Sequence, residues 1–338
     1  MSTEPTTQAD SAAGAASLPD LERLFELALT IQLCDDRMQK EVKSGNIKAA
    51  TYPVRGLEGV CAALGTALTR QDYMVSTYRN LGDVIAKGIP LGSVIAEICG
   101  RVTGVARGKG GAMHMADTSV GFMTTTGIVG SGLPIATGLA LASKLAGDDR
   151  VTVVTFGDGA TSIGAFHEAM NLATLWKLPL VFVCQNNGWG EHTPIEEYMI
   201  NTDISAKARS YGLVAERVDG FDAAVTLGAV RRAIDAARSG QGPRFIEAMT
   251  YRLSGHTSTT DFSYMDKQVL ESFKENDAIV RLRSALESAG AGEAVESISA
   301  TATATVAEAF AFAFASEYPD PHDAYTDVFA TTAREETL

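Results

Sequence analysis

Apolar and polar residues follow a helical period over most of the first 150 residues of this chain. From Asp20 to Lys48, apolar residues recur at steps of three and four and charged residues fill much of the other face, which predicts a helix. Further helices are predicted up to Thr69, over Ile85–Val102 and over Leu133–Ala146, and a short strand is predicted over residues 73–79. The segment from Gly104 to Gly132 contains eight glycines, which is typical of a functional loop.

The pattern changes after Gly147. Apolar runs rich in β-branched residues predict strands at Val151–Phe156, Leu180–Gln185, Leu213–Val218 and Phe245–Met249, with helices at Thr161–Leu175 and Ala223–Arg238. This rhythm predicts an α/β fold in which helices flank a parallel sheet on both faces. Residues 301–316 are ambiguous, because their phenylalanines alternate as in a strand, but their high alanine content favours a helix.

Composition narrows the class of protein. A net charge of −13 over 338 residues would repel nucleic acid and anionic membranes, so we expect neither as a partner. No run reaches the about 20 apolar residues of a membrane span, and the start has no secretory signal, so we expect a cytoplasmic protein. The four separated cysteines predict free thiols and no zinc site. The Ala-, Ser- and Thr-rich composition of residues 1–17 predicts a disordered tail. We expect residues 18–338 to form one domain with a C-terminal extension.

Two polar clusters follow neighbouring predicted strands. Gly157-Asp158-Gly159-Ala160 ends one strand and Gln185-Asn186-Asn187 ends the next, so that Asn187 comes 29 residues after Asp158. In a right-handed βαβ unit the parallel strands end at the same edge of the sheet, about 4.8 Å apart. Asp158 and Asn187 can therefore share one Mg²⁺ ion, and the glycines allow a phosphate to approach the backbone. The simpler alternative is that Asp158 only caps the helix that follows.

The sequence resembles the thiamine-diphosphate-binding fold, whose cofactor signature is GDG, a spacer and NN. More narrowly, it resembles the alpha subunits of pyruvate, branched-chain 2-oxo acid and acetoin dehydrogenases from about Leu21 to Ala330. The matching stretches are STYRNLG (76–82), ARGKGGAMHMAD (106–117), TGIVGSGLPIATG (126–138), GDGATSIGAFHEAMNLATLWKLP (157–179), QNNGWG (185–190) and TYRLSGHTSTTD (250–261). The resemblance implies this fold with an N-terminal helical extension, and thiamine diphosphate and Mg²⁺ as cofactors.

The resemblance also implies roles for individual residues. Magnesium would be bound by Asp158, Asn187 and the backbone carbonyl of Trp189. The cofactor would also contact Tyr78, Arg79, Gly127, Val129, Gly159 and Ala160. His114 and His256 match two active-site histidines, and imidazole can donate or shuttle protons near neutral pH. A lone histidine more often makes a structural hydrogen bond, but these two lie in Gly-rich or Ser/Thr-rich segments, which favours function.

The reaction implied by the resemblance cleaves a carbon–carbon bond of pyruvate, another 2-oxo acid or acetoin. The acyl group then passes to a lipoyl arm on an acyltransferase. In such enzymes a separate beta subunit supplies the catalytic glutamate, so we expect two alpha and two beta subunits and an inactive isolated chain. Departures from the family pattern at Tyr52, Thr126, Ile163 and Met265 leave the substrate open.

Three alternatives compete with this interpretation. A nicotinamide enzyme would need G-x-G-x-x-G at the start of a helix, and G-I-V-G-S-G at residues 127–132 does not match. The departures at Tyr52, Ile163 and Met265 suggest a non-catalytic relative that binds the cofactor or only a partner chain. A thiamine-diphosphate lyase that is assembled from split chains and acts on another substrate fits the same motifs.

Overall fold

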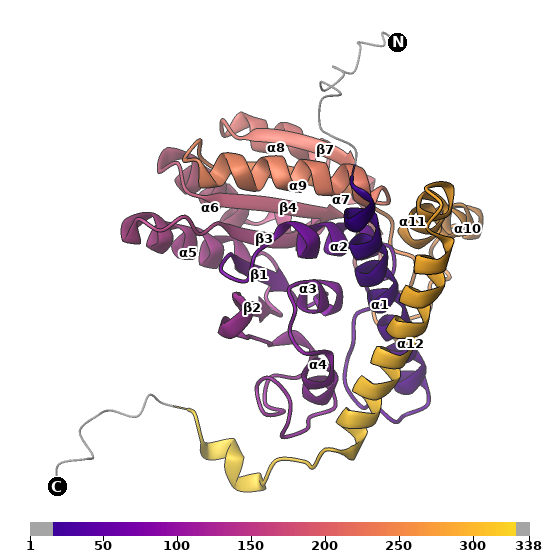
Figure 1. The fold of residues 1–338 in the computed structure, drawn as a ribbon. Helices are drawn as coiled ribbons and strands as arrows, with labels where there is room; N and C mark the ends of the chain where they lie inside the picture. Colours follow the sequence, from indigo (N-terminus) through magenta and orange to yellow (C-terminus); the bar gives the residue numbers. More distant parts are fainter. Residues whose placement is uncertain (1–15, 329–338) are drawn as a thin grey trace, which may run out of the picture.

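A computed structural model describes residues 16–328 and contains one six-stranded sheet (Figure 1). The strands of this sheet are β1 (Tyr73–Thr77), β2 (Phe122–Thr126), β3 (Thr152–Gly157), β4 (Leu180–Asn186), β7 (Val214–Asp219) and β8 (Arg244–Met249). Their order is β2-β1-β3-β4-β8-β7, and every neighbouring pair is parallel. The predicted parallel sheet is confirmed.

The two central strands, β3 and β4, have side chains buried on both faces. Every residue of β4 is buried, and in β3 only the last residue is partly exposed. Because side chains alternate along a strand, Val153 and Val181 pack into one hydrophobic core, whereas Phe156 and Phe182 pack into the other. Helices must therefore cover both faces of the sheet.

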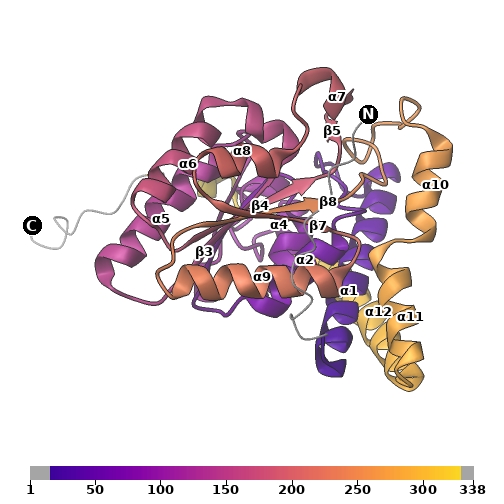
Figure 2. The same cartoon turned by 90° about the horizontal axis from the view of Figure 1, so that it is seen from above.

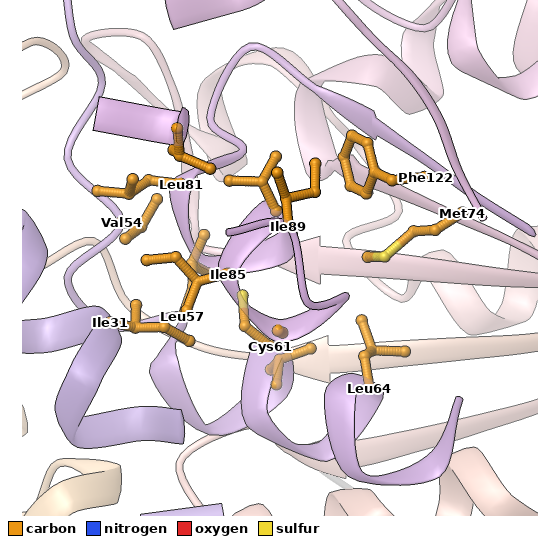
Figure 3. Packing of buried hydrophobic residues seen from close by; sticks show 14 of the residues in the cluster. Ile31, Val54, Leu57, Cys61, Leu64, Met74, Leu81, Ile85, Ile89 and Phe122 are labelled. Atoms are coloured by element: carbon orange, nitrogen blue, oxygen red, sulfur yellow. The ribbon is translucent and has the colours of Figure 1, made fainter. Parts of the chain in front are cut away.

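The helices that cover the sheet form two layers, which Figure 2 shows from above. On one face lie α5 (Gly132–Ala146), α6 (Gly164–Leu175) and α8 (Ile204–Ser210), and on the other lie α2 (Glu58–Ala67) and α9 (Ala223–Arg238). Near β1, the core that contains Val153 and Val181 also includes α3 (Leu81–Ala86). Figure 3 shows Ile31, Cys61, Leu64, Met74 and Ile85 packed in this core. Cys34, Cys61 and Cys184 are buried free thiols, as predicted.

An outer group of helices consists of α1 (Leu18–Lys43), α4 (Leu91–Ile98), α11 (Ala278–Ser288) and α12 (Gly292–Ala315). In this group α1 and α11 contact α2, and α1 and α4 contact α3. Helix α10 (Lys267–Glu275) packs instead in a separate small core through Leu270. Within residues 16–328, α12 alone has the length and apolar composition of a membrane-spanning helix, which the sequence analysis did not expect. In the fold, α12 packs along α1, α4 and α11. The helix predicted over residues 301–316 is confirmed.

Two sequence predictions differ from the structure. The helix predicted over Ile85–Val102 is wrong, because α3 and α4 are separate helices there. Gly88 adopts a left-handed conformation with φ of 91°, and Pro90 immediately precedes α4, so the chain turns between them. Strand β2 lies inside the glycine-rich segment, where no strand was predicted. The predicted disordered tail lies almost entirely outside the described residues.

The segment after α12 returns to the glycine-rich loop. The Asp327 carboxylate accepts hydrogen bonds from Arg107 Nη2 at 2.6 Å and from Lys109 Nζ at 2.9 Å. Thr326 also accepts a hydrogen bond from Lys109 Nζ through its side-chain oxygen at 2.7 Å. These contacts are exposed and therefore individually weak, but together they fix where the chain crosses the loop.

Candidate active site

Strands β3 and β4 bring Asp158 and Asn187 together at one edge of the sheet. Gly157 pairs with Gln185 in the parallel register, and the two polar residues follow within two positions. The backbone N–H of Asn187 donates to Asp158 Oδ1 at 3.2 Å. The two residues that the sequence assigned to one ion therefore lie side by side.

Asp158 is a buried carboxylate without a cationic partner. It is 1% exposed, and no lysine, arginine or histidine nitrogen within residues 16–328 lies within 4.0 Å of it. The hydroxyl of Tyr198, at the end of α7 (Ile195–Tyr198), donates to Asp158 Oδ2. Burial raises the pKa of this carboxyl. An uncompensated carboxylate at this depth suits a bound divalent cation.

The remaining oxygen donors come from the turn after β4. Asn187 Oδ1 accepts a hydrogen bond from the backbone N–H of Trp189 at 3.1 Å. Trp189 begins the short antiparallel pair of β5 (Trp189–Gly190) and β6 (Thr193–Pro194). In the described part of the chain there is no cluster of three or more His, Cys, Asp or Glu side chains that could bind a metal. A cation here would need amide and carbonyl oxygens, which Asn187 and Trp189 provide.

These residues line a cavity of about 310 Å³. Of the residues predicted for the site, nine line it: Tyr78, Arg79, Val129, Asp158, Gly159, Ala160, Asn187, Trp189 and His256. Gly127 and His114 do not line the cavity but lie against each other beside it. A Cβ atom at Gly127 would be 3.7 Å from His114 Nε2.

Two buried arginines in the cavity lack carboxylate partners. Arg79 is 8% exposed and Arg252 is 2% exposed, and within the described residues neither has a carboxylate oxygen within 4.0 Å. Arg79 donates to the carbonyl of Pro53, and Arg252 donates to the hydroxyl of Tyr264 at 2.6 Å. The Nε of Arg252 is buried without a hydrogen-bond partner. Paired guanidinium groups of this kind suit an anionic ligand.

His256 lies between the two guanidinium groups. Its Nδ1 is 3.3 Å from Arg79 Nη2 and 3.5 Å from Arg252 Nη1. Burial, followed by the charges of Arg79 and Arg252, lowers the pKa of His256 to about 4. The imidazole is therefore neutral at pH 7 and can donate one hydrogen bond and accept another.

The residues that depart from the family pattern differ in how closely they approach this cavity. The ring of Tyr52 is 4.5 Å from that of Tyr78 and 5.4 Å from that of His256. Ile163 covers Gly130, where an added Cβ would lie 2.1 Å from Ile163 Cδ1. Met265 is buried in a separate small core. Tyr52 and Ile163 therefore both pack against residues that line the cavity.

The family model for the dehydrogenase E1 component matches residues 27–322. The chain belongs to the E1 dehydrogenase alpha-subunit family. It is an oxidoreductase component of the 2-oxo acid and acetoin dehydrogenase family, whose members use thiamine diphosphate.

Similar proteins are named as alpha subunits either of an acetoin oxidoreductase or of pyruvate dehydrogenase. The chain is 36% identical over 309 residues to the alpha subunit of acetoin:2,6-dichlorophenolindophenol oxidoreductase from Bacillus subtilis, covering 91% of this chain and 93% of that protein. It is 35% identical over 281 residues to a pyruvate dehydrogenase E1 alpha subunit from Zymomonas mobilis, covering 82% of this chain and 79% of that protein. A human mitochondrial pyruvate dehydrogenase E1 alpha subunit is 32% identical over 276 residues, covering 81% and 70% respectively.

Two residues of this E1 alpha chain's site carry no signal in the sequence. Arg252 lies in the quoted stretch before His256, yet nothing in the sequence distinguishes it from an exposed arginine. Tyr198 lies 40 residues after Asp158 on a four-residue helix, too short for a helical pattern to predict. Tertiary folding brings Arg252 to the cavity and the Tyr198 hydroxyl to Asp158.

Proposed function

We propose that this chain is the alpha subunit of a pyruvate-type 2-oxo acid dehydrogenase or an acetoin dehydrogenase, and that it binds thiamine diphosphate through Mg²⁺. The observation that carries the proposal is the buried Asp158 carboxylate, which has no cationic side chain within 4.0 Å among residues 16–328 and lies beside Asn187 in a cavity of about 310 Å³. When bound, thiamine diphosphate supplies a carbanion that attacks the substrate carbonyl and a ring that accepts the electrons released on bond cleavage.

One set of residues would bind the metal ion, and another would bind the diphosphate. Asp158, Asn187 and the Trp189 carbonyl would hold Mg²⁺ with oxygen ligands. Gly159 would let the diphosphate approach the backbone, since a Cβ atom added there meets no atom closer than 3.9 Å. Arg79 would neutralise phosphate charge, and the Arg252 Nε, which has no hydrogen-bond partner among residues 16–328, would be free to donate.

The histidines would act near the reacting carbonyl. His256 is neutral at pH 7, so it can donate a hydrogen bond to a developing oxyanion without adding another positive charge beside the arginines. His114 would act from its position next to Gly127. Membership of the family and the positions of these side chains support both roles.

The active site requires a partner in this proposal. Within the described residues, the cavity walls provide Asp158 and Glu191 as carboxylates, and Glu191 reaches Arg252 through its backbone carbonyl. A beta subunit would supply the glutamate that deprotonates the cofactor and would cover the apolar residues Ile128 and Val129, which are 71% and 47% exposed. The complete enzyme would contain two alpha and two beta subunits and would transfer the acyl group to a lipoyl-bearing acyltransferase.

The test is to co-express the chain with its beta subunit and measure reduction of 2,6-dichlorophenolindophenol with pyruvate, acetoin or 3-methyl-2-oxobutanoate. We expect turnover with one of these substrates, none from the isolated alpha chain, and at least a thousandfold loss in Asp158→Ala. Glu168→Gln, an exposed change on α6, is the matched control and should retain activity.

The other outcomes separate the alternatives. Cofactor binding without turnover of any tested substrate would favour a lyase with another substrate or a non-catalytic relative. Unchanged Mg²⁺-dependent cofactor binding in Asp158→Ala, measured by quenching of tryptophan fluorescence, would refute the proposed metal site.

A further inference from the structure

Glu97, near the end of α4, is a buried carboxylate bound only by backbone N–H groups. Its side chain is fully buried, and in the described part of the chain no cationic side chain lies within 4.0 Å of it. Oε1 accepts from the N–H groups of Gly110 at 2.7 Å and Gly111 at 3.0 Å. Oε2 accepts from those of Ala106 at 2.8 Å and Gly108 at 2.9 Å. One carboxylate thus satisfies four backbone donors of the glycine-rich loop.

The backbone of residues 104–111 is shaped around this carboxylate. Arg107, Gly108 and Gly111 have φ of 56°, 75° and 63°, left-handed conformations that direct successive N–H groups toward one acceptor. A Cβ atom at Gly104 would lie 2.3 Å from Glu97 Oε2. Arg107 is not a glycine, so its conformation costs about 1 kcal/mol, which the charge-assisted hydrogen bonds to Glu97 offset.

The ordered loop leads directly to His114. A Cβ atom at Gly110 would lie 1.9 Å from the His114 carbonyl oxygen, so the loop closes tightly on that residue. On either side of His114, Thr125 Oγ1 donates to the Met113 carbonyl at 2.6 Å and accepts from the Met115 N–H at 2.8 Å. The backbone of His114 is therefore held between the Glu97-centred loop and β2.

We propose that Glu97 is a positioning residue that sets the conformation of residues 104–111 and thereby places the His114 imidazole beside the active-site cavity. Glu97 would not touch substrate or cofactor. Its effect on turnover, which rests on the proposed function, would pass through His114. The effect on the loop itself is independent of any catalytic role.

The change that tests this is Glu97→Gln, which keeps the shape of the side chain but turns one acceptor oxygen into an NH₂ group. That group would face two backbone N–H donors. We expect amides of residues 106–111 to lose protection in hydrogen exchange measured by mass spectrometry on the isolated chain. In the assembled enzyme we expect kcat to fall about tenfold to a hundredfold, with cofactor affinity changed less than threefold, because no residue of 104–111 lines the cavity.

A double-mutant cycle with His114→Ala distinguishes positioning from general damage. If Glu97 acts through His114, Glu97→Gln lowers kcat less than threefold in the His114→Ala background. Full additivity of the two losses would overturn the proposal, as would unchanged protection of the loop amides in Glu97→Gln. Glu41→Gln is the matched control, a buried glutamate on α1 that should alter neither readout.

A second variant tests, independently of Glu97, whether the placement of His114 controls turnover. Thr125→Val removes the hydroxyl that binds Met113 and Met115 but leaves Glu97 intact. We expect it to lower kcat through the same histidine while loop protection at residues 106–111 is retained. Because the exchange measurement needs neither cofactor nor beta subunit, an enzyme without turnover would refute the proposed function but leave the result for the loop in place.

Discussion

His256 shows how burial and neighbouring charges together determine the protonation state of a single residue. Burial disfavours a charged ring, and a proton on it would also add a third positive charge beside Arg79 and Arg252, so the fold favours the neutral form. Its pKa lies near 4 in the fold, against about 6.5 in an unfolded chain. Between these values the unfolded chain binds more protons, so the contribution of His256 to stability decreases as the pH falls from about 6.5 to 4.

This charge environment gives a measurable prediction. In NMR spectra of the isolated chain, the Cε1–H resonance of His256 should titrate near pH 4. Adding Mg²⁺ and thiamine diphosphate should raise this pKa, because the diphosphate neutralises the arginines, and Arg252→Gln should also raise it. The resonance of His167, on the exposed side of α6, should not respond to cofactor and serves as the control. A pKa above 6 for His256 in the free chain would contradict this account.

At the same scale, the sequence predicts some site residues and not others. Asp158 and Asn187 were predictable because each follows a recognisable buried strand, and parallel strands end at one edge. Arg252 and Tyr198 were not, because their positions depend on how a loop and a short helix fold back over that edge. His114 was predicted for the site, and the structure places it beside the cavity rather than in its wall.

At the scale of elements, α5 illustrates two uses of glycine. Gly147 ends the helix in a left-handed conformation with φ of 70°, and its N–H donates to the carbonyls of Ser143 and Lys144. Gly138 lies in the middle of the same helix without a special φ, and a Cβ atom there would meet nothing within 4 Å. The first glycine is required by geometry, and the second only costs conformational entropy.

Alanine substitutions at the two positions should therefore have opposite effects. Gly147→Ala should lower the free energy of unfolding by about 1 kcal/mol, because alanine is strained at positive φ. Gly138→Ala should raise it by up to about 1 kcal/mol through helix propensity. Urea unfolding of the isolated chain measures both, with each variant as the control for the other. Shifts in the same direction would contradict this reading of the helix.

Prediction of helices succeeded where the apolar pattern extends over several turns and a capping residue marks the end. The helix Ala223–Arg238 is found with the predicted bounds, capped by the Asp222 side chain. The apolar period across Ile85–Val102 concealed a break at Gly88 and Pro90. Strand β2 was missed because Phe122–Thr126 is short and lies within a segment whose glycines indicated a loop.

At the scale of the whole molecule, apolar side chains remain exposed around the cavity. Ile128 and Val129 lie on the loop that precedes α5, and Ile135, on the first turns of α5, is 42% exposed. Isolated exposed apolar residues are common, but a group beside a functional cavity is typical of an interface. We expect the proposed beta subunit to cover this group.

A charge introduced in this group should prevent assembly. Ile135→Lys should elute as the alpha chain alone in size-exclusion chromatography of the co-expressed subunits, with an unchanged circular dichroism spectrum. Leu145→Lys makes the same change about 15 Å further along α5, at a residue that is 79% exposed, and should still assemble. Assembly of Ile135→Lys with normal yield would show that the partner binds elsewhere.

The contact between Asp327 and the Arg107–Lys109 loop joins residues 220 and 218 positions apart in the chain. A ribosome synthesises the chain from its N-terminus, at about 5–20 residues per second. Asp327 is therefore synthesised about ten seconds or more after the loop. Glu97, which binds the loop from inside the fold, is synthesised before it. Nascent chains halted before Asp327 should expose this loop to proteases, and released chains should protect it.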